Sequence, residues 1–309
     1  MLHFLKLIRY KNLFLLALMQ FIFRFGYLEP IKIPLSLWLW QYALLVLSTV
    51  LIAAGGYVIN DIMDQDTDLE NHPEKVIVGK YISESKAYTI YVTLTIIGVG
   101  LGFILANMVN HPNLGVLFVL IATLLYFYAT TLKQIALLGN IIVALLLAFS
   151  VLIIGVFDIF PNTFEVNREQ MLLAFAILFD YAKFAFIINL VREIIKDIED
   201  IEGDNSQGIK TLPVLIGAQK TSKIAFVLLL LPTLYLLYYL NTYLFNNNLY
   251  LGIIYMLIFV IAPLIFALIK IWSAKEKADY SLISSLLKWI IFFGILSIAI
   301  VTYNTKHHG

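Results

Sequence analysis

The chain has 309 residues, of which 61% are apolar and only 13% are charged. Soluble domains are nearer half apolar and a quarter charged, so this much apolar surface cannot be hidden inside a soluble fold of this size. The 21 basic and 20 acidic side chains nearly balance, which argues against a nucleic-acid binder. Because there is no cysteine, disulfides and thiolate metal sites are excluded. The composition indicates a polytopic membrane protein.

Apolar runs long enough to cross a bilayer, about 20 residues each, follow one another along the chain. They are rich in Leu and Ile without strict alternation, which favours helices over the strands of a membrane barrel. We predict nine spans, at residues 13–28, 35–59, 86–107, 114–131, 136–157, 170–195, 222–241, 249–271 and 282–303. The expected fold is an all-α bundle of nine transmembrane helices, forming a single domain over residues 1–309.

Basic residues gather in every second connection between these spans. If the N-terminus is cytoplasmic, most of the 21 basic residues face the cytoplasm, and the outer segments contain only Lys32, Arg168 and Lys306. Cytoplasmic loops of membrane proteins carry such an excess of Lys and Arg. We therefore expect a multi-pass protein of the plasma or inner membrane, if bacterial or archaeal, with its C-terminus outside.

Three charged residues fall inside predicted spans, where charge is costly. Asp180 and Lys183 stand three residues apart, so they can neutralise each other on one helix face. Arg24 is expected to extend its side chain toward the membrane interface.

Twelve of the 20 carboxylates lie in two short windows, with Glu70 and Glu74 counted after the first, and each window lies at the predicted cytoplasmic end of a span. The first runs from Asn60 to Asp68 after the second span, and the other from Arg192 to Asp204 after the sixth. Each contains three aspartates at i, i+3 and i+7, which share one face if the helix continues. These aspartates are Asp61, Asp64 and Asp68, and then Asp197, Asp200 and Asp204.

Such stripes of oxygen ligands favour a hard cation, Mg²⁺ or Ca²⁺, rather than zinc. Two acidic helix ends that face each other could hold two or three Mg²⁺ ions around one diphosphate. One charged run alone is more often a solvated face, but two with matched offsets favour metal binding. A calcium EF-hand fits less well, because Leu69 takes its glycine position and Lys75 its glutamate position.

Lysines flank both stripes. Lysine is a suitable point-charge partner for a diphosphate. The tendency of basic residues to stay on the cytoplasmic side explains the same lysines without any ligand. Both interpretations stay open for Lys75, Lys133, Lys196 and Lys210.

The residues of both windows form a pattern similar to that of a known family. Asn60-Asp61-x-x-Asp64-x-x-x-Asp68 resembles the first aspartate motif of the UbiA superfamily of intramembrane prenyltransferases, and Asp200-x-x-x-Asp204, after Lys196-Asp197, resembles the second. The run from Tyr128 to Lys133, followed by Gly139-Asn140, resembles the family's loop between helices 4 and 5. Arg9 and Asn12 match positions near the family's N-terminus. The resemblance covers essentially the whole chain.

This resemblance implies an enzyme that binds Mg²⁺ and a prenyl diphosphate between the two motifs. The implied metal site consists of Asn60, Asp61, Asp64, Asp68, Asp200 and Asp204. The implied catalytic residues are Asp64, Asp68, Asp197 and Asp200. The residues implied to contact the diphosphate or the acceptor are Arg9, Asn12, Lys75, Tyr128, Lys133, Lys196 and Lys210. Many members carry an Arg-Pro pair after the first motif, whereas this chain has His72-Pro73-Glu74-Lys75.

The run from Arg192 to Asp204 looks most like the branch that prenylates geranylgeranylglyceryl phosphate to make ether-lipid precursors. An aromatic acceptor of quinone biosynthesis, 4-hydroxybenzoate or dihydroxynaphthoate, is the alternative. The expected partners are a prenyl diphosphate, a lipophilic acceptor and membrane lipids, with no nucleic acid and no obligatory protein partner.

Two readings from other classes are weaker. A cation or organic-anion transporter would place its acids nearer the membrane midplane. A phosphoalcohol transferase would need an Asp-Gly-x-x-Ala-Arg opening, which neither window has.

Overall fold

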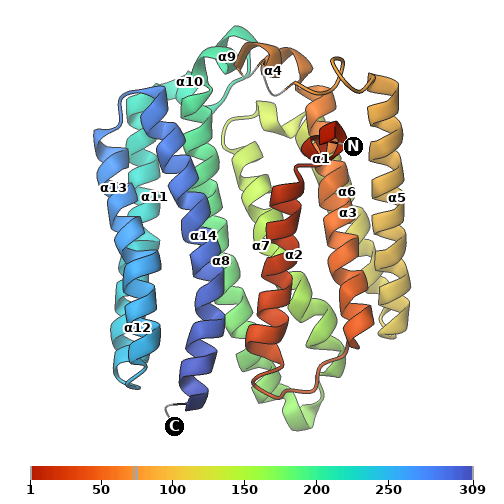
Figure 1. Ribbon diagram of the computed structural model, residues 1–309, viewed down its shortest axis with the longest axis vertical. Coiled ribbons are helices and arrows are strands. Elements are labelled where there is room, and N and C mark those ends of the chain that lie inside the picture. Colours follow the sequence, from red (N-terminus) through yellow and green to blue (C-terminus); the bar gives the residue numbers. More distant parts are fainter. Residues whose placement is uncertain (1, 72, 74–75, 308–309) are drawn as a thin grey trace.

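The computed structural model describes residues 2–71, 73 and 76–307, which fold into a bundle of long helices (Figure 1). The described residues form no β-strand and only two isolated β-bridges, so the predicted all-α fold is confirmed. The long helices are α3 (Leu39–Met63), α5 (Glu84–Met108), α6 (Gly115–Thr130), α7 (Leu138–Asp158), α8 (Arg168–Glu199), α11 (Ala218–Tyr239) and α14 (Lys277–His307). A further rod joins α12 (Tyr250–Met256), η7 (Leu257–Ile261) and α13 (Ala262–Ser273).

In the described part of the chain, eight helical segments are long and apolar enough to cross a membrane, and they correspond to the second to ninth predicted spans. The first predicted span is helical as well. There α2 (Tyr10–Phe23) runs directly into the π-helical turn η1 (Arg24–Leu28). This segment packs against α3, α7 and α14, so it belongs to the same bundle.

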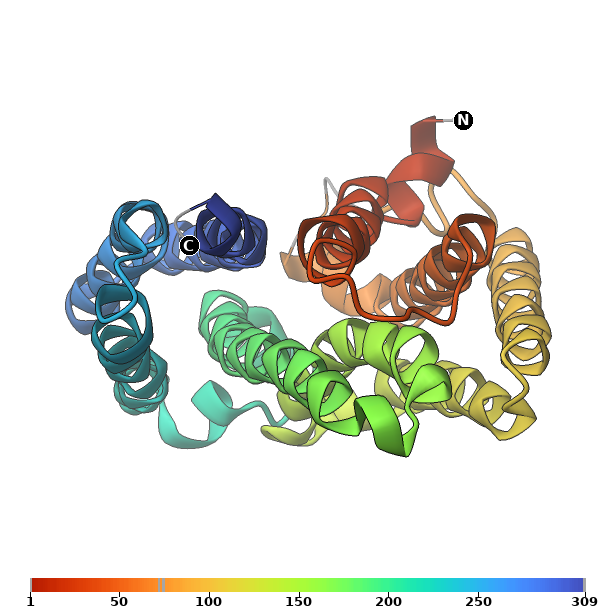
Figure 2. The same ribbon diagram turned by 90° about the horizontal axis from the view of Figure 1, so that it is seen from below.

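The helix α8 joins two hydrophobic cores. Its first half belongs to a core that also takes residues from α2, α3, α5, α6 and α7, and its second half belongs to a core with residues from α11, α13 and α14. In the view along the bundle, the green α8 lies between these two groups (Figure 2). Close packing of membrane helices relies on small residues. At the contact of α5 with α6, a Cβ atom on Gly102 would lie 2.2 Å from the Phe118 ring, so only glycine fits there.

The two termini lie at opposite ends of the bundle (Figure 1). The N-terminal helix α1 (Leu2–Leu7) shares its end with three short helices, α4 (Gln65–Asn71), α9 (Ile201–Ser206) and α10 (Leu212–Ile216). Both acidic windows therefore lie at the end that holds the N-terminus. We call it the acidic end, and the end that holds the C-terminus the distal end.

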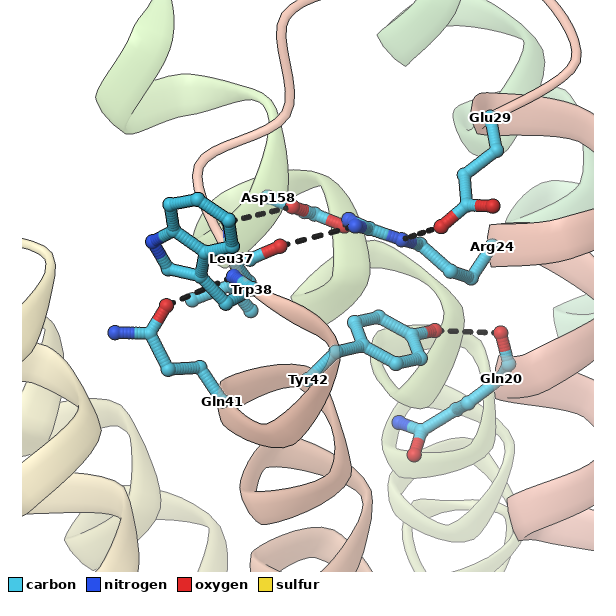
Figure 3. Close-up of polar contacts among 8 residues, drawn as sticks. All are labelled: Gln20, Arg24, Glu29, Leu37, Trp38, Gln41, Tyr42 and Asp158. Atoms are coloured by element: carbon cyan, nitrogen blue, oxygen red, sulfur yellow. Dashed lines mark hydrogen bonds and ion pairs between the residues drawn. The ribbon is translucent and has the colours of Figure 1, made fainter.

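A buried charge network closes the distal end (Figure 3). Arg24 forms an ion pair with Asp158, which is completely buried, and donates a hydrogen bond of 2.9 Å to the Leu37 carbonyl. The Leu37 amide in turn donates to Asp158 at 3.0 Å. At this end of the bundle, the partner at the end of α7 holds the Arg24 side chain inside, where it is buried. The expected pairing of Lys183 with Asp180 is confirmed, at 2.6 Å.

Candidate active site

The two acidic windows share one local backbone structure. Helix α3 ends at Asp64 and α8 ends at Asp200, with φ, ψ of −98°, 7° and −102°, 10°. A short helix then starts at the next residue, α4 in the first window and α9 in the second. Neither helix continues straight on, because aspartate is a poor residue for a helix interior and a good one for the N-cap, the position that Asp200 takes at the start of α9. Each bend turns the last aspartate of its motif back over the bundle.

The bends bring the two windows together. Helices α4 and α9 pack against each other at the acidic end (Figure 1). Asp204 is buried there, and its burial, together with the nearby charges of Asp200 and Asp64, raises the pKa of its carboxyl to about 6. The structure thus brings Asp64, Asp200 and Asp204 close together at the acidic end.

Asp64 is the centre of the first stripe. The Asn60 amide donates a hydrogen bond of 2.6 Å to one of its oxygens, and the Lys133 ammonium pairs with the other. Lys133 lies on the short helix η3 (Leu132–Gln134), which α7 holds closely. A Cβ atom on Gly139 would lie 2.8 Å from the Lys133 Cα atom, so glycine is required for this approach.

Arg9 supports the stripe from the N-terminal segment. It has a left-handed backbone, with φ of 51°, at the break between α1 and α2. The break directs its side chain onto α3, where it pairs with Asp61 at 3.0 Å and lies 5.0 Å from the centre of the Tyr57 ring. Asp61 is therefore tied to Arg9 rather than turned toward Asp64.

On the second stripe, Asp197 accepts a hydrogen bond of 2.8 Å from Asn140. One turn earlier, Glu193 pairs with Arg192 at 2.9 Å and with Lys196 at 3.1 Å. The Tyr128 hydroxyl lies within the electrostatic reach of Asp64, Asp197 and Glu193, and so near both stripes.

Sequence reasoning assigned no role in the site to Asn140 or to Glu193. Asn140 follows Gly139 in the loop that resembles the family, and Glu193 lies one turn before Asp197 on α8. Both signals were thus present in the sequence. The sequence did not indicate which side chain Asn140 or Glu193 would contact.

Two predicted substrate contacts, Lys210 and Asn12, do not join this cluster. Lys210 has an exposed side chain, although its backbone bridges to Ile135 beside Lys133. Asn12 accepts a hydrogen bond of 3.0 Å from Lys288 on α14 instead. Lys75 lies outside the described residues.

The donor chemistry at the meeting point fits a hard divalent cation. The Asn60 side-chain oxygen is buried and lacks a hydrogen-bond partner among the described groups, so it is an acceptor available to a ligand. No three acidic or histidine side chains within the described ranges converge tightly enough to form a complete metal cage. That is the arrangement Mg²⁺ tolerates, since it commonly takes one or two carboxylates and completes its shell with water and phosphate oxygens.

An apolar helical bundle with paired acidic helix ends and basic counter-charges at one end defines an integral membrane protein with a charged site at one end of the bundle. Comparison with known proteins identifies it further. The chain belongs to the UbiA prenyltransferase family, which it matches over residues 31–303. It is therefore a prenyltransferase, and the transporter reading is set aside.

Its curated relatives include two archaeal digeranylgeranylglyceryl phosphate synthases. The protein of Methanosphaera stadtmanae is 33% identical over 236 residues, covering 75% of this chain and 77% of the relative. That of Sulfurisphaera tokodaii is 32% identical over 266 residues, covering 85% of each.

Solved structures share the fold. A structure of a digeranylgeranylglyceryl phosphate synthase in membranes has 25% sequence identity and a TM-score of 0.64, and the match covers 98% of both chains. A UbiA homologue from Archaeoglobus fulgidus, bound to GPP and Mg²⁺, has 16% identity and a TM-score of 0.55 over 96% of this chain and 99% of its own. At that identity the second likeness shows the fold alone.

Proposed function

We propose that this enzyme transfers a geranylgeranyl group from geranylgeranyl diphosphate to geranylgeranylglyceryl phosphate. The choice of acceptor is carried by the curated relatives, which are named digeranylgeranylglyceryl phosphate synthase and match up to 85% of the chain. In the reaction, the glycerol hydroxyl oxygen bonds to the allylic carbon of the donor. The bond from that carbon to the diphosphate oxygen breaks, and its electron pair leaves with the diphosphate.

We assign the cation site to Asn60, Asp64, Asp68, Asp200 and Asp204, with Asp61 beside them. The available Asn60 oxygen and the proximity of Asp204 to Asp64 support this assignment. Bound Mg²⁺ would neutralise the diphosphate and stabilise the negative charge that develops as the allylic bond breaks. Arg9 holds Asp61 in place through its ion pair.

The basic residues of the cluster hold the leaving group. Lys133 is paired with Asp64, so its ammonium lies where a diphosphate between the stripes would be bound. The Tyr128 hydroxyl lies near both stripes and can donate a hydrogen bond to a phosphate oxygen. Lys75, Lys196 and Lys210 stay in our proposal as further contacts, with Lys196 positioned through Glu193.

Asp197 is our candidate for the base that takes the proton from the attacking hydroxyl. Its carboxylate is oriented by Asn140 and lies beside the second stripe, within the electrostatic reach of Asp204. A base must be held within hydrogen-bond distance of the proton that it removes, and the Asn140 contact supplies that orientation. Below the site, the apolar cores of the bundle exclude water from the allylic cation.

For orientation, we propose that the acidic end faces the cytoplasm. The basic residues concentrate at the ends of helices on that side, as cytoplasmic segments do. The N-terminus lies at the same end, in agreement with this orientation.

A transfer assay with purified protein in detergent tests the function. Labelled geranylgeranyl diphosphate and Mg²⁺ are supplied with geranylgeranylglyceryl phosphate, 4-hydroxybenzoate or dihydroxynaphthoate. We expect product with the glycerol phosphate alone, and none with EDTA or in the Asp64→Asn variant. The matched control is Asp66→Asn, because Asp66 lies in the same window but is exposed. If product forms only with an aromatic acceptor, the assigned acceptor is wrong, but the protein is still a prenyltransferase.

A further inference from the structure

A basic cluster that the mechanism does not use lies beside the acidic stripes. Lys288 lies on α14, where its ammonium donates a hydrogen bond of 3.0 Å to the Asn12 side chain on α2. The charged groups that act on it are Arg192 and Lys11, and both are positive. In the described part of the chain, no carboxylate pairs with Lys288. A half-buried lysine on a membrane helix is costly without a negative partner.

Arg192 on α8 is the second open group of this cluster. One of its terminal nitrogens pairs with Glu193 at 2.9 Å. Its Nε is buried and has no hydrogen-bond partner among the described groups. Buried donors are nearly always satisfied in native structures, so this nitrogen points to a ligand with an acceptor oxygen. We call Lys11, Asn12, Arg192 and Lys288 the α2–α8–α14 cluster.

The cluster adjoins the reaction site without being part of it. Helix α14 packs against both α2 and α8. Lys288 on α14 bonds Asn12 on α2 and lies within the electrostatic reach of Arg192 on α8 and of Lys11, so these groups lie near one another. Glu193 interacts with Arg192 and is also reached by the charges of Lys196 and Arg9. Glu193 thus links the cluster to the side chains that surround Asp64 and Asp197.

We propose that the α2–α8–α14 cluster binds the phosphate monoester of the acceptor lipid, and so selects a phosphorylated acceptor. This inference rests on the proposed function. In a glycerol phosphate, the reacting hydroxyl and the phosphate lie on neighbouring carbon atoms, so the phosphate must bind close to the base. The donor's diphosphate is a poorer occupant, because our proposal already pairs it with Lys133 beside Asp64 and because the carboxylate of Glu193 adjoins the cluster.

The test compares geranylgeranylglyceryl phosphate with its dephosphorylated alcohol as acceptors. In Lys288→Gln, we expect KM for the phosphorylated acceptor to rise about ten- to a hundredfold, as for the loss of a hydrogen bond to a charged group. KM for the alcohol and for geranylgeranyl diphosphate should stay within about twofold of the unmodified enzyme. Lys288→Arg should keep most of the affinity, and Asn12→Ala should show a smaller rise. Lys277→Gln is the matched control, because Lys277 is an exposed lysine at the start of the same helix.

Each outcome decides between the alternatives. Unchanged KM values in Lys288→Gln, with transfer intact, would refute the cluster and leave the proposed function standing. A raised KM for the donor alone would assign the cluster to the diphosphate. If the unmodified enzyme gives no product with the phosphorylated acceptor but prenylates another one, the proposed function fails instead. Thermal unfolding of every variant separates loss of folding from loss of binding, and Lys288→Arg keeps the test informative if Lys288→Gln does not fold.

Discussion

The two ends of the bundle treat buried charge in opposite ways. At the distal end, Arg24 and Asp158 satisfy each other and the Leu37 backbone, and nothing in this network is left for a ligand. At the acidic end, the Asn60 oxygen and the Arg192 Nε are buried and available. The network at the distal end stabilises the fold, whereas the buried groups at the acidic end are available to bind ligands. The difference teaches that the partners of a buried charge, rather than its burial, mark a functional site.

The largest effect is expected at the acidic end. Replacing Asp64 by Asn removes the carboxylate that meets both Asn60 and Lys133. Because the cation that would neutralise the leaving diphosphate loses a carboxylate ligand, we expect kcat to fall by at least about a thousandfold. The thermal unfolding midpoint should change little, since the residue lies at a helix end. A variant that loses its fold together with its activity would contradict the division between the two ends.

The distal end should show the reverse pattern. Asp158→Ala leaves Arg24 buried without its main partner, and breaking a buried pair in this way costs about 3 to 5 kcal/mol of the free energy of unfolding. We expect a lower unfolding midpoint in detergent, with the KM values of the remaining folded enzyme unchanged. The double variant Arg24→Met/Asp158→Leu should recover much of the loss, because no unpaired charge remains. A selective rise in KM would show that the distal network reaches the site.

The acidic end should also make the stability of the protein depend on Mg²⁺ and on pH. Because the pKa of Asp204 is raised to about 6, above its ordinary value of 3.8, the folded protein binds this proton more tightly than the unfolded chain. The stability of the metal-free protein should therefore decline as pH rises from about 4 to 6. Cation binding needs the ionised carboxylate, so Mg²⁺ at about 100 times its Kd should stabilise the protein by about 2.7 kcal/mol at pH 8 and by much less at pH 5.

Thermal unfolding with Mg²⁺ or EDTA across this range measures the difference. The Asp204→Asn variant is the control, because it should lose the pH dependence of the Mg²⁺ effect between pH 5 and 7. A Mg²⁺ effect of equal size at pH 5 and pH 8 would remove Asp204 from the cation site.

The smallest effect is expected for Glu29, the outer partner of Arg24. Its side chain is 44% exposed, compared with 7% for Arg24, and the pair is 3.1 Å long. Exposed ion pairs contribute little, so Glu29→Gln should lower the free energy of unfolding by less than about 1 kcal/mol. Equal losses in Glu29→Gln and Asp158→Ala would mean that the distal network depends on its outer edge rather than on its buried pair.

The sequence predicts what lies along one helix much better than what lies between helices. Apolar runs located the spans to within a few residues, and the spacing of Asp180 and Lys183 predicted a pair that forms. The i, i+4 offset likewise places Asn60 beside Asp64. These relations follow from the period of a single helix.

Contacts between helices carry no such signal. Arg24 and Asp158 are separated by 134 positions, and Asn12 and Lys288 by 276. Nothing in the local pattern shows which helices meet, so the buried state of Arg24 was missed. The bends at Asp64 and Asp200 also escaped prediction, because each depends on one backbone residue at a helix end.

Those two bends have a consequence for the electrostatics of the backbone. Both acidic motifs stand at the carboxyl ends of long helices, α3 and α8, where the aligned peptide dipoles amount to about half a negative charge. Carboxylates are unfavourable in that place, and cations are favourable. Part of the attraction for a metal ion is thus supplied by main-chain carbonyls that no side-chain substitution removes. Aspartate-to-asparagine variants should accordingly keep a weak residual affinity for divalent ions, even where transfer is lost.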